Sequence, residues 1–137
     1  DMRLIAGEAF GHRSPVKTYG EMFYLDAKFS ADSSLTLPEE LGQRAAYVVS
    51  GKLTCGEESY SPGDMLIFDE GAKARLRAAE EARGALLGGP KMPEPRHMFW
   101  NFVSSRPERI EEAKAAWAAD KFPKVPGDDK ERIPLPE

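Results

Sequence analysis

The sequence predicts an all-β fold, a small sandwich or barrel followed by one helix and an extended tail. Two glycine-containing turns, Gly56-Glu57-Glu58 and Ser61-Pro62-Gly63-Asp64, separate short runs of β-branched, aromatic and aliphatic residues, a spacing typical of consecutive antiparallel strands. In the clearest run, which ends at Ala78, apolar residues alternate with cations, so one face meets a core and the other carries positive charge. The cations are Lys73, Arg75 and Arg77.

Strands are also predicted on both sides of this central stretch. Arg3 to Ala6 is a short apolar piece, and residues 7–20 are predicted as a loop because glycine, proline and polar residues are scattered through them. Apolar and polar residues alternate from Glu21 to Ser30, which predicts a half-buried strand. Leu35 with Leu37 predicts a shorter strand, and Ala85 to Leu87 predicts a return to the sheet.

The last third of the chain has a different pattern. Its most aromatic segment is predicted as a closing strand with Met98, Trp100 and Phe102 on one face, so the strands extend to about residue 103. Ser105 as N-cap and Pro107 in the first turn predict a helix over about 106–119. Residues 120–137 have no hydrophobic period and several prolines, so an extended tail is expected.

Length, charge and cysteine content exclude several classes of protein. A chain of 137 residues is expected to form one domain, covering residues 1–137. Its formal net charge of -4 gives no reason to expect direct binding of nucleic acid. The single cysteine cannot form an internal disulfide, no apolar run is long enough to cross a membrane, and the start lacks the features of a signal peptide. We therefore expect a soluble, cytoplasmic protein without a membrane partner.

Four residues of the central stretch have the spacing of a known motif. Gly63, Asp69, Gly71 and Ala74 follow the pattern glycine, five residues, proline, one residue, glycine, two residues, histidine. This resembles the second motif of cupins, in which the histidine is a metal ligand. Asp69 replaces the proline, and Ala74 replaces the histidine. The resemblance implies a cupin-type double-stranded β-helix, that is, a jelly-roll barrel.

The first cupin motif ends in a glutamate, six residues and a glycine. Gly51 fits the glycine, and Arg44 stands where the glutamate ligand would be. Metals that prefer nitrogen and oxygen need imidazoles and carboxylates converging on one point, whereas alanine has no lone pair and arginine brings positive charge. With Arg44 and Ala74 at the ligand positions, we expect no metal, no cofactor and no catalytic residue in this chain.

A more specific resemblance covers nearly the whole chain. The segments IAGEAFGHRSPVKTY, RAAYVVSG, EPRHMFWNFVSS and IPLPE together resemble the carboxyl-terminal half of pirins, which are two-cupin proteins. The resemblance implies that the metal, held in that family by three histidines and a glutamate, belongs to the amino-terminal half, which this sequence does not contain. That half is implicated in quercetin 2,3-dioxygenase activity and in regulating the binding of transcription factors to DNA. Iron or another divalent metal is expected only there.

Few other polar candidates remain. His97 is a candidate ligand or base, but a lone histidine without an evident carboxylate partner is more often structural. Cys55 is expected to pack as a small apolar side chain. The cationic strand face is either solvated or a docking surface for an acidic partner. That face comprises Lys73, Arg75 and Arg77.

Three functions stay open. In the first, the chain is a non-catalytic cupin that supports a metal-bearing cupin half or pairs with a copy of itself, since an isolated half would expose an apolar surface. We therefore expect a homodimer or a complex with an amino-terminal pirin cupin half. In the second, it is part of a metal-dependent dioxygenase of the quercetin 2,3-dioxygenase kind, through His97 or as a fragment of a complete pirin. In the third, the barrel interior accepts a small apolar molecule without catalysis.

Overall fold

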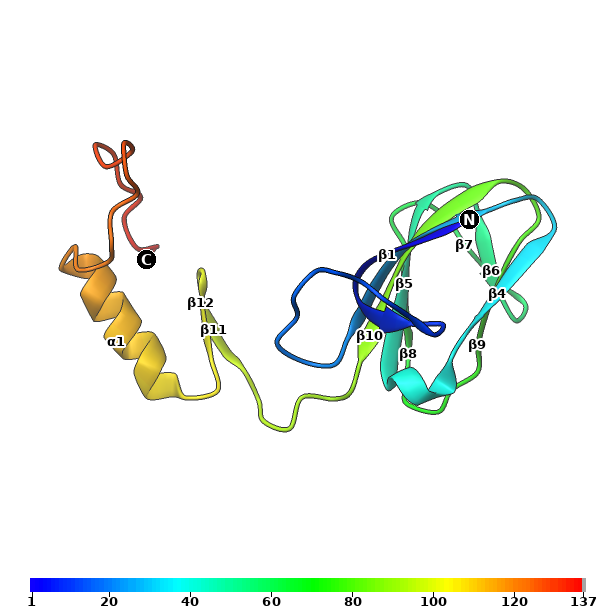
Figure 1. Ribbon diagram of the computed structural model, residues 1–137, viewed down its shortest axis with the longest axis horizontal. Helices are drawn as coiled ribbons and strands as arrows, with labels where there is room; N and C mark the ends of the chain where they lie inside the picture. Colours follow the sequence, from blue (N-terminus) through cyan, green and yellow to red (C-terminus); the bar gives the residue numbers. More distant parts are fainter. Residues whose placement is uncertain (137) are drawn as a thin grey trace. The chain divides into compact units, whose positions relative to one another are not determined.

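The computed structural model describes residues 1–136, in which the chain divides into two compact units. The first unit spans Asp1–Lys91 and contains two β-sheets, and the second begins at Met92 and contains a hairpin and a helix (Figure 1). That the whole chain behaves as one domain stays a prediction.

The larger sheet of the first unit has the strand order β2-β1-β3-β10-β5-β8. Its strands are β1 (Met2–Ala9), β2 (His12–Arg13), β3 (Phe23–Phe29), β5 (Gln43–Ser50), β8 (Met65–Phe68) and β10 (Ala82–Gly89). The smaller sheet has the order β4-β9-β6-β7. Its strands are β4 (Ser33–Leu37), β6 (Leu53–Cys55), β7 (Glu58–Tyr60) and β9 (Ala74–Ala78). A short 3-10 helix, η1 (Glu39–Leu41), joins β4 to β5.

The inner faces of the two sheets share one core. Along β3 and β9 every second residue is buried, which confirms the alternation predicted from the sequence. Apolar side chains from both sheets form a single buried cluster, in which Phe23, Leu76 and Leu86 are almost completely enclosed. Burial of each such side chain contributes about 1.5–3 kcal/mol. The predicted fold class, an all-β jelly-roll sandwich with one helix after it, is confirmed.

The loop predicted over residues 7–20 is wrong in its first half. β1 continues to Ala9 and turns back into β2, which pairs with it antiparallel. The two residues of this turn, Phe10 and Gly11, have φ angles of 53° and 72°. A two-residue hairpin turn of type I′ requires positive φ at both central positions, a requirement that usually selects Asn-Gly. Phenylalanine in the first position hid the turn.

The second unit contains a correction of the same kind. The predicted closing strand is a hairpin of β11 (His97–Phe99) and β12 (Phe102–Ser104), which pair only with each other in the described structure. Trp100, at the turn, has a φ angle of 49°. Because the chain reverses at this turn, the three residues predicted on one strand face do not share it. Met98 is exposed, whereas Trp100 and Phe102 contact each other edge to face.

Helix α1 (Pro107–Ala118) lies within the predicted range. The predicted N-cap, Ser105, is wrong: Arg106 is the N-cap and makes no capping hydrogen bond with its side chain. Pro107 begins the helix as expected, because its missing N–H would be unpaired there anyway. At the other end the main-chain N–H groups of Asp120 and Lys121 donate to the carbonyls of Trp117 and Ala116, which is a Schellman motif.

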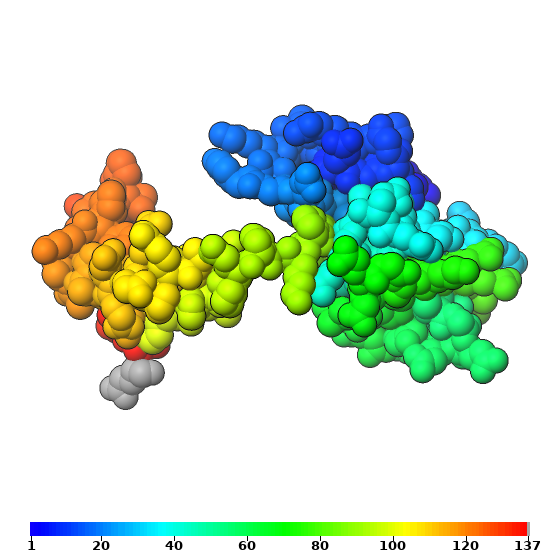
Figure 2. Space-filling model, turned by 90° about the horizontal axis from the view of Figure 1, so that it is seen from below, coloured from blue at the N-terminus to red at the C-terminus, as the bar shows by residue number. Residues whose placement is uncertain are grey.

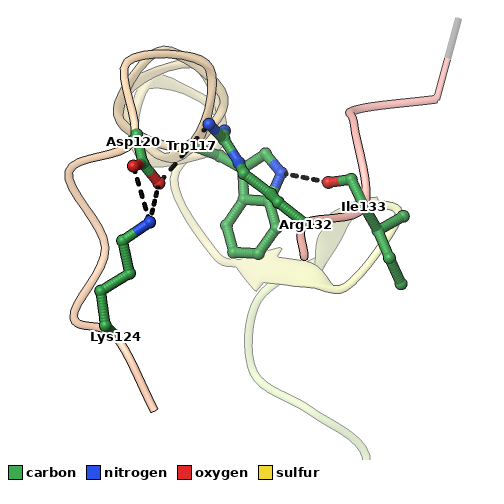
Figure 3. A network of polar contacts seen from close by, with 5 residues as sticks. All are labelled: Trp117, Asp120, Lys124, Arg132 and Ile133. Carbon is green, nitrogen blue, oxygen red and sulfur yellow. Dashed lines mark hydrogen bonds and ion pairs between the residues drawn. The ribbon is translucent and has the colours of Figure 1, made fainter. Parts of the chain in front are cut away.

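The tail after α1 lies against the helix (Figure 3). The indole Nε1 of Trp117 donates to the carbonyl of Ile133 over 3.0 Å, and the guanidinium of Arg132 lies 5.2 Å from the centre of the indole ring. Asp120 forms ion pairs with Lys124 and Arg132. One tryptophan thus fixes a segment that has no regular secondary structure of its own.

Within residues 1–136, the single α-helix is too short and too polar to cross a lipid bilayer.

Candidate functional site

The most unusual side chain of the first unit is Arg44 on β5, which is only 1% exposed. Alternation along β5 points residue 44 to the same inner face as Ala46 and Val48. The guanidinium donates five hydrogen bonds, all to main-chain carbonyls. Nε donates to Gly42 (3.1 Å), Nη1 to Leu37 (3.3 Å) and Pro38 (3.2 Å), and Nη2 to Asp69 (3.1 Å) and Ala72 (2.6 Å).

These contacts explain how a charge is tolerated in the core. An arginine side chain has five N–H donors and no acceptor, and a buried polar group without partners is costly. In residues 1–136, no carboxylate oxygen lies within 4.0 Å of Arg44. The positive charge is therefore stabilised by the dipoles of carbonyl groups. These groups come from the end of β4, from the segment before β5 and from the turn between β8 and β9.

The structure brings the two cupin ligand positions to the same end of the barrel. Ala74 is completely buried and pairs across the sheet with Leu37, one of the residues whose carbonyl accepts from Arg44. Gly88 leaves room for the arginine stem, since a Cβ there would lie 3.1 Å from Cγ of Arg44 and 2.5 Å from a ring carbon of Phe23. At this end of the barrel the two positions are therefore filled by a guanidinium that donates to main-chain carbonyls and by a methyl group.

The structure does not bring His97 into the same unit. His97 begins β11 in the second unit, and its side chain is exposed. Within residues 1–136, no three His, Cys, Asp or Glu side chains are arranged to hold a metal ion. Cys55 is half-buried against the core of the first unit, where it packs as a small apolar side chain.

The cationic face predicted from the sequence lies on β9 and just before it. Arg75 and Arg77 alternate with the buried residues of β9 and are exposed, and Lys73 precedes the strand.

On the outer face of the larger sheet, Asp26 is the only carboxylate among residues 1–136 whose pKa is shifted. Both of its oxygens accept from Arg83, at 2.7 and 2.8 Å, and this pairing lowers the pKa of Asp26.

A cavity of about 910 Å³, which the sequence did not indicate, opens at the rim of the first unit. It lies between the loop of residues 14–22 and the segment around η1, and the loop stands away from the rest of the unit (Figure 2). Its charged lining comprises Glu8, Arg13, Lys17, Glu21, Glu40 and Glu70. No spacing of residues signals this cavity, because a loop without periodicity forms most of its wall.

Sequence reasoning also missed the partners of Arg44. All of them are main-chain oxygens, and because every residue has one, the residue type does not show which of them accept from Arg44. The one available indication was the position of the arginine, at which the alternation of β5 requires an inward-facing residue. A buried arginine needs acceptors, but the sequence does not say which segments supply them.

An antiparallel two-sheet barrel with the paired motif positions at one end defines a cupin domain. Residues 24–123 match the family model described as the pirin C-terminal cupin domain. The chain belongs to the pirin family.

A related protein agrees with this assignment, and two solved structures share the fold. A pirin-like protein of Caulobacter vibrioides is 40% identical over 135 residues, which cover 98% of this chain and 46% of that protein. The crystal structure of a quercetin 2,3-dioxygenase from Acinetobacter baumannii has a TM-score of 0.86 at 20% identity, covering 99% of this chain and 47% of the other. An Escherichia coli pirin in complex with nickel(II) has a TM-score of 0.57 at 17% identity, covering 67% and 40%. The chain thus spans less than half the length of these relatives.

Proposed function

We propose that this chain is a metal-free, non-catalytic cupin domain that supports a metal-bearing cupin half of a pirin-like protein. The observation that carries the proposal is the buried guanidinium of Arg44. It stands at a ligand position, has no lone pair to offer a metal and repels a cation. Ala74, at the second position, also lacks a donor atom.

The outer face of the larger sheet supports an interaction role. Strand register places Met65 opposite Tyr47 and Ile67 opposite Ala45, and Leu87 opposite both Ala45 and Tyr24. Ile67 is 75% exposed and Met65 is 52% exposed, on a strand at the sheet edge. Contiguous exposed apolar side chains next to an unpaired strand edge favour association with another protein surface.

A second cupin half is the occupant that we propose for this face. The relatives are more than twice as long as the matched region, so a further half is available in proteins of this kind. In the isolated chain a second copy takes its place, and the product is a homodimer. We also propose a cytoplasmic location, in keeping with the single free cysteine.

Light scattering of the 137-residue chain at micromolar concentration tests this interface. The wild type is expected to have the mass of a dimer, and Ile67→Lys the mass of a monomer, because a buried unpaired charge opposes association. Val125→Lys, at an exposed position of the second unit, is the matched control and is expected to leave the dimer intact. A monomeric wild type contradicts the proposal.

Elemental analysis of the same preparation tests the absence of a metal. We expect far less than one atom of iron, manganese or nickel per chain. Metal near one atom per chain that is lost in His97→Ala would instead support the second candidate.

That second candidate is a metal-dependent dioxygenase of the quercetin 2,3-dioxygenase kind, an activity named for the structurally similar Acinetobacter baumannii protein. Oxygen consumption with quercetin, measured after addition of iron, manganese or nickel, distinguishes it. Oxygen consumption by this chain alone favours the dioxygenase. If this chain consumes no oxygen while a full-length relative is active in the same assay, the result favours the support role.

A third candidate, binding of a small molecule without catalysis, is favoured by the 910 Å³ cavity. The interior of the barrel is filled by the apolar cluster, so the cavity at the rim is the candidate site for ligand binding. A ligand that raises the unfolding temperature of the wild type, but not of a Leu41→Arg variant at the cavity wall, would support it.

A further inference from the structure

The outer face of the smaller sheet carries only hydroxyl groups and guanidinium groups along its central row. Thr54 pairs with both Ser59 and Arg77, and Arg77 also pairs with Ser34, so these four side chains form one row across the sheet. The next row contains Arg75 and Thr36. The burial pattern of β9 directs both arginines away from the core.

Among the described residues, these cations form no ion pairs. In residues 1–136, no carboxylate oxygen lies within 4.0 Å of Lys73, Arg75 or Arg77. By contrast, a cation on the outer face of the larger sheet is paired, because Arg83 forms an ion pair with Asp26 on the adjacent strand. A carboxylate at a cross-strand position of β9 would stabilise the smaller sheet in the same way. This face instead presents an arginine pair flanked by hydroxyls in a chain of net charge -4.

The geometry of the arginine pair suits an extended acidic segment. Side chains two residues apart on one strand are about 6.5–7 Å apart, and this is also the spacing of alternate side chains in an extended partner. Guanidinium groups bind carboxylates through paired hydrogen bonds, and hydroxyls can donate to the remaining oxygen atoms.

Acidic turns limit the length of the partner. Glu80 and Glu81 follow β9 beyond its Arg77 end. Glu57 lies in the turn after β6 and Glu58 begins β7, and the antiparallel register places this turn toward Arg75. A long polyanion such as a nucleic acid would be repelled at both ends. A short segment with a few alternating carboxylates would contact only the cations.

We propose that the outer face of the smaller sheet, centred on Arg75 and Arg77, docks an extended acidic polypeptide segment with carboxylates at alternate residues. The proposal is independent of the proposed function, because the two faces belong to opposite sheets.

Fluorescence anisotropy with two labelled peptides of equal composition tests it at low salt. One peptide, (Glu-Thr)₄, alternates its carboxylates, and the other, Glu₄Thr₄, groups them. The wild type is expected to bind the alternating peptide at least about threefold more tightly than the grouped one. Arg75→Thr/Arg77→Thr is expected to weaken that binding by about tenfold or more. The control Lys28→Thr/Lys91→Thr removes two exposed cations elsewhere and should change it less than about twofold.

Equal weakening by the two double variants, with both folded by circular dichroism, would overturn the proposal. No binding of either peptide by the wild type at low salt would also overturn it, and so would equal affinity for the two peptides. A single-stranded octanucleotide serves as a further comparison. If it binds more tightly than the peptides and depends on the same arginines, the proposed polypeptide partner is wrong and the partner is a nucleic acid.

Discussion

Arg44 combines nearly complete burial with hydrogen bonds to main-chain carbonyls alone. Its five acceptors belong to three separate segments of the first unit, so the guanidinium links the end of β4, the start of β5 and the turn before β9. One side chain therefore adds five contacts to the strand pairing that already joins β4 to β9.

Replacing Arg44 should destabilise the first unit strongly. Arg44→Met keeps the apolar stem but removes the donors of five hydrogen bonds. The carbonyls of Pro38 and Asp69 keep main-chain donors, whereas each buried carbonyl that loses its partner costs about 1–3 kcal/mol before relaxation. We expect a loss of about 3 kcal/mol or more in the free energy of unfolding, measured by urea denaturation. Arg83→Met, at an exposed ion pair, is the control and should cost less than about 1 kcal/mol. Equal losses in the two variants would contradict this account.

The Asp26–Arg83 pair should make stability depend on pH. Arg83 holds the pKa of Asp26 below its ordinary value, so the native state binds fewer protons than the unfolded chain in acid. The contribution is complete above the ordinary pKa, about 3.9, and is lost as pH falls through the lowered native value. Asp26→Asn should therefore reduce stability at neutral pH and have little effect in strong acid. In an Arg83→Gln background, this pH dependence of the Asp26→Asn effect should become much smaller, because only the weaker attraction of Lys28 and Arg3 then lowers the pKa of Asp26.

At the scale of elements, α1 and the tail depend on one aromatic cluster. Trp117 contacts Trp100 and Phe122 at ring separations of 5.2 and 5.4 Å, and it also fixes the tail through Ile133 and Arg132. In the second unit, Ile110 is the only fully buried apolar residue among those described. These half-buried rings therefore supply most of its packing.

Trp117→Phe removes the Nε1 donor while keeping an aromatic ring. We expect tryptic cleavage at Lys130 and Arg132 to become about threefold faster or more, because the tail opens more often. Phe99→Leu, which alters a ring outside this hydrogen bond, should leave the cleavage rate near that of the wild type. Mass spectrometry of the early fragments gives the rates, and equal rates in wild type and Trp117→Phe would show that the tail is held by other contacts.

Elements with a strict period were predictable, and those set by a single turn were not. β3 and β9 followed from alternation, and α1 from its proline and apolar spacing. The β1–β2 hairpin and the β11–β12 hairpin were missed because Phe10 and Trp100 adopt positive φ without the usual glycine or asparagine. The assignment of Arg44 and Ala74 to ligand positions rests on motif spacing and stays a prediction, whereas the carbonyl acceptors of Arg44 could be found only from the fold.

At the scale of the whole molecule, the remaining prediction is that the two compact units unfold together. Both tryptophans, Trp100 and Trp117, belong to the second unit, whereas most strands belong to the first. Tryptophan fluorescence therefore follows the second unit alone during heating, whereas far-ultraviolet circular dichroism follows both units, with most of the strand signal coming from the first. A single domain predicts coincident midpoints. Midpoints separated by more than about 5 °C would show two domains.

The cation at the end of this barrel is a covalent part of the polypeptide. It cannot dissociate, be removed by a chelator, exchange for a competing ion or change its oxidation state. The contacts made by Arg44 should therefore persist when divalent metals are scarce.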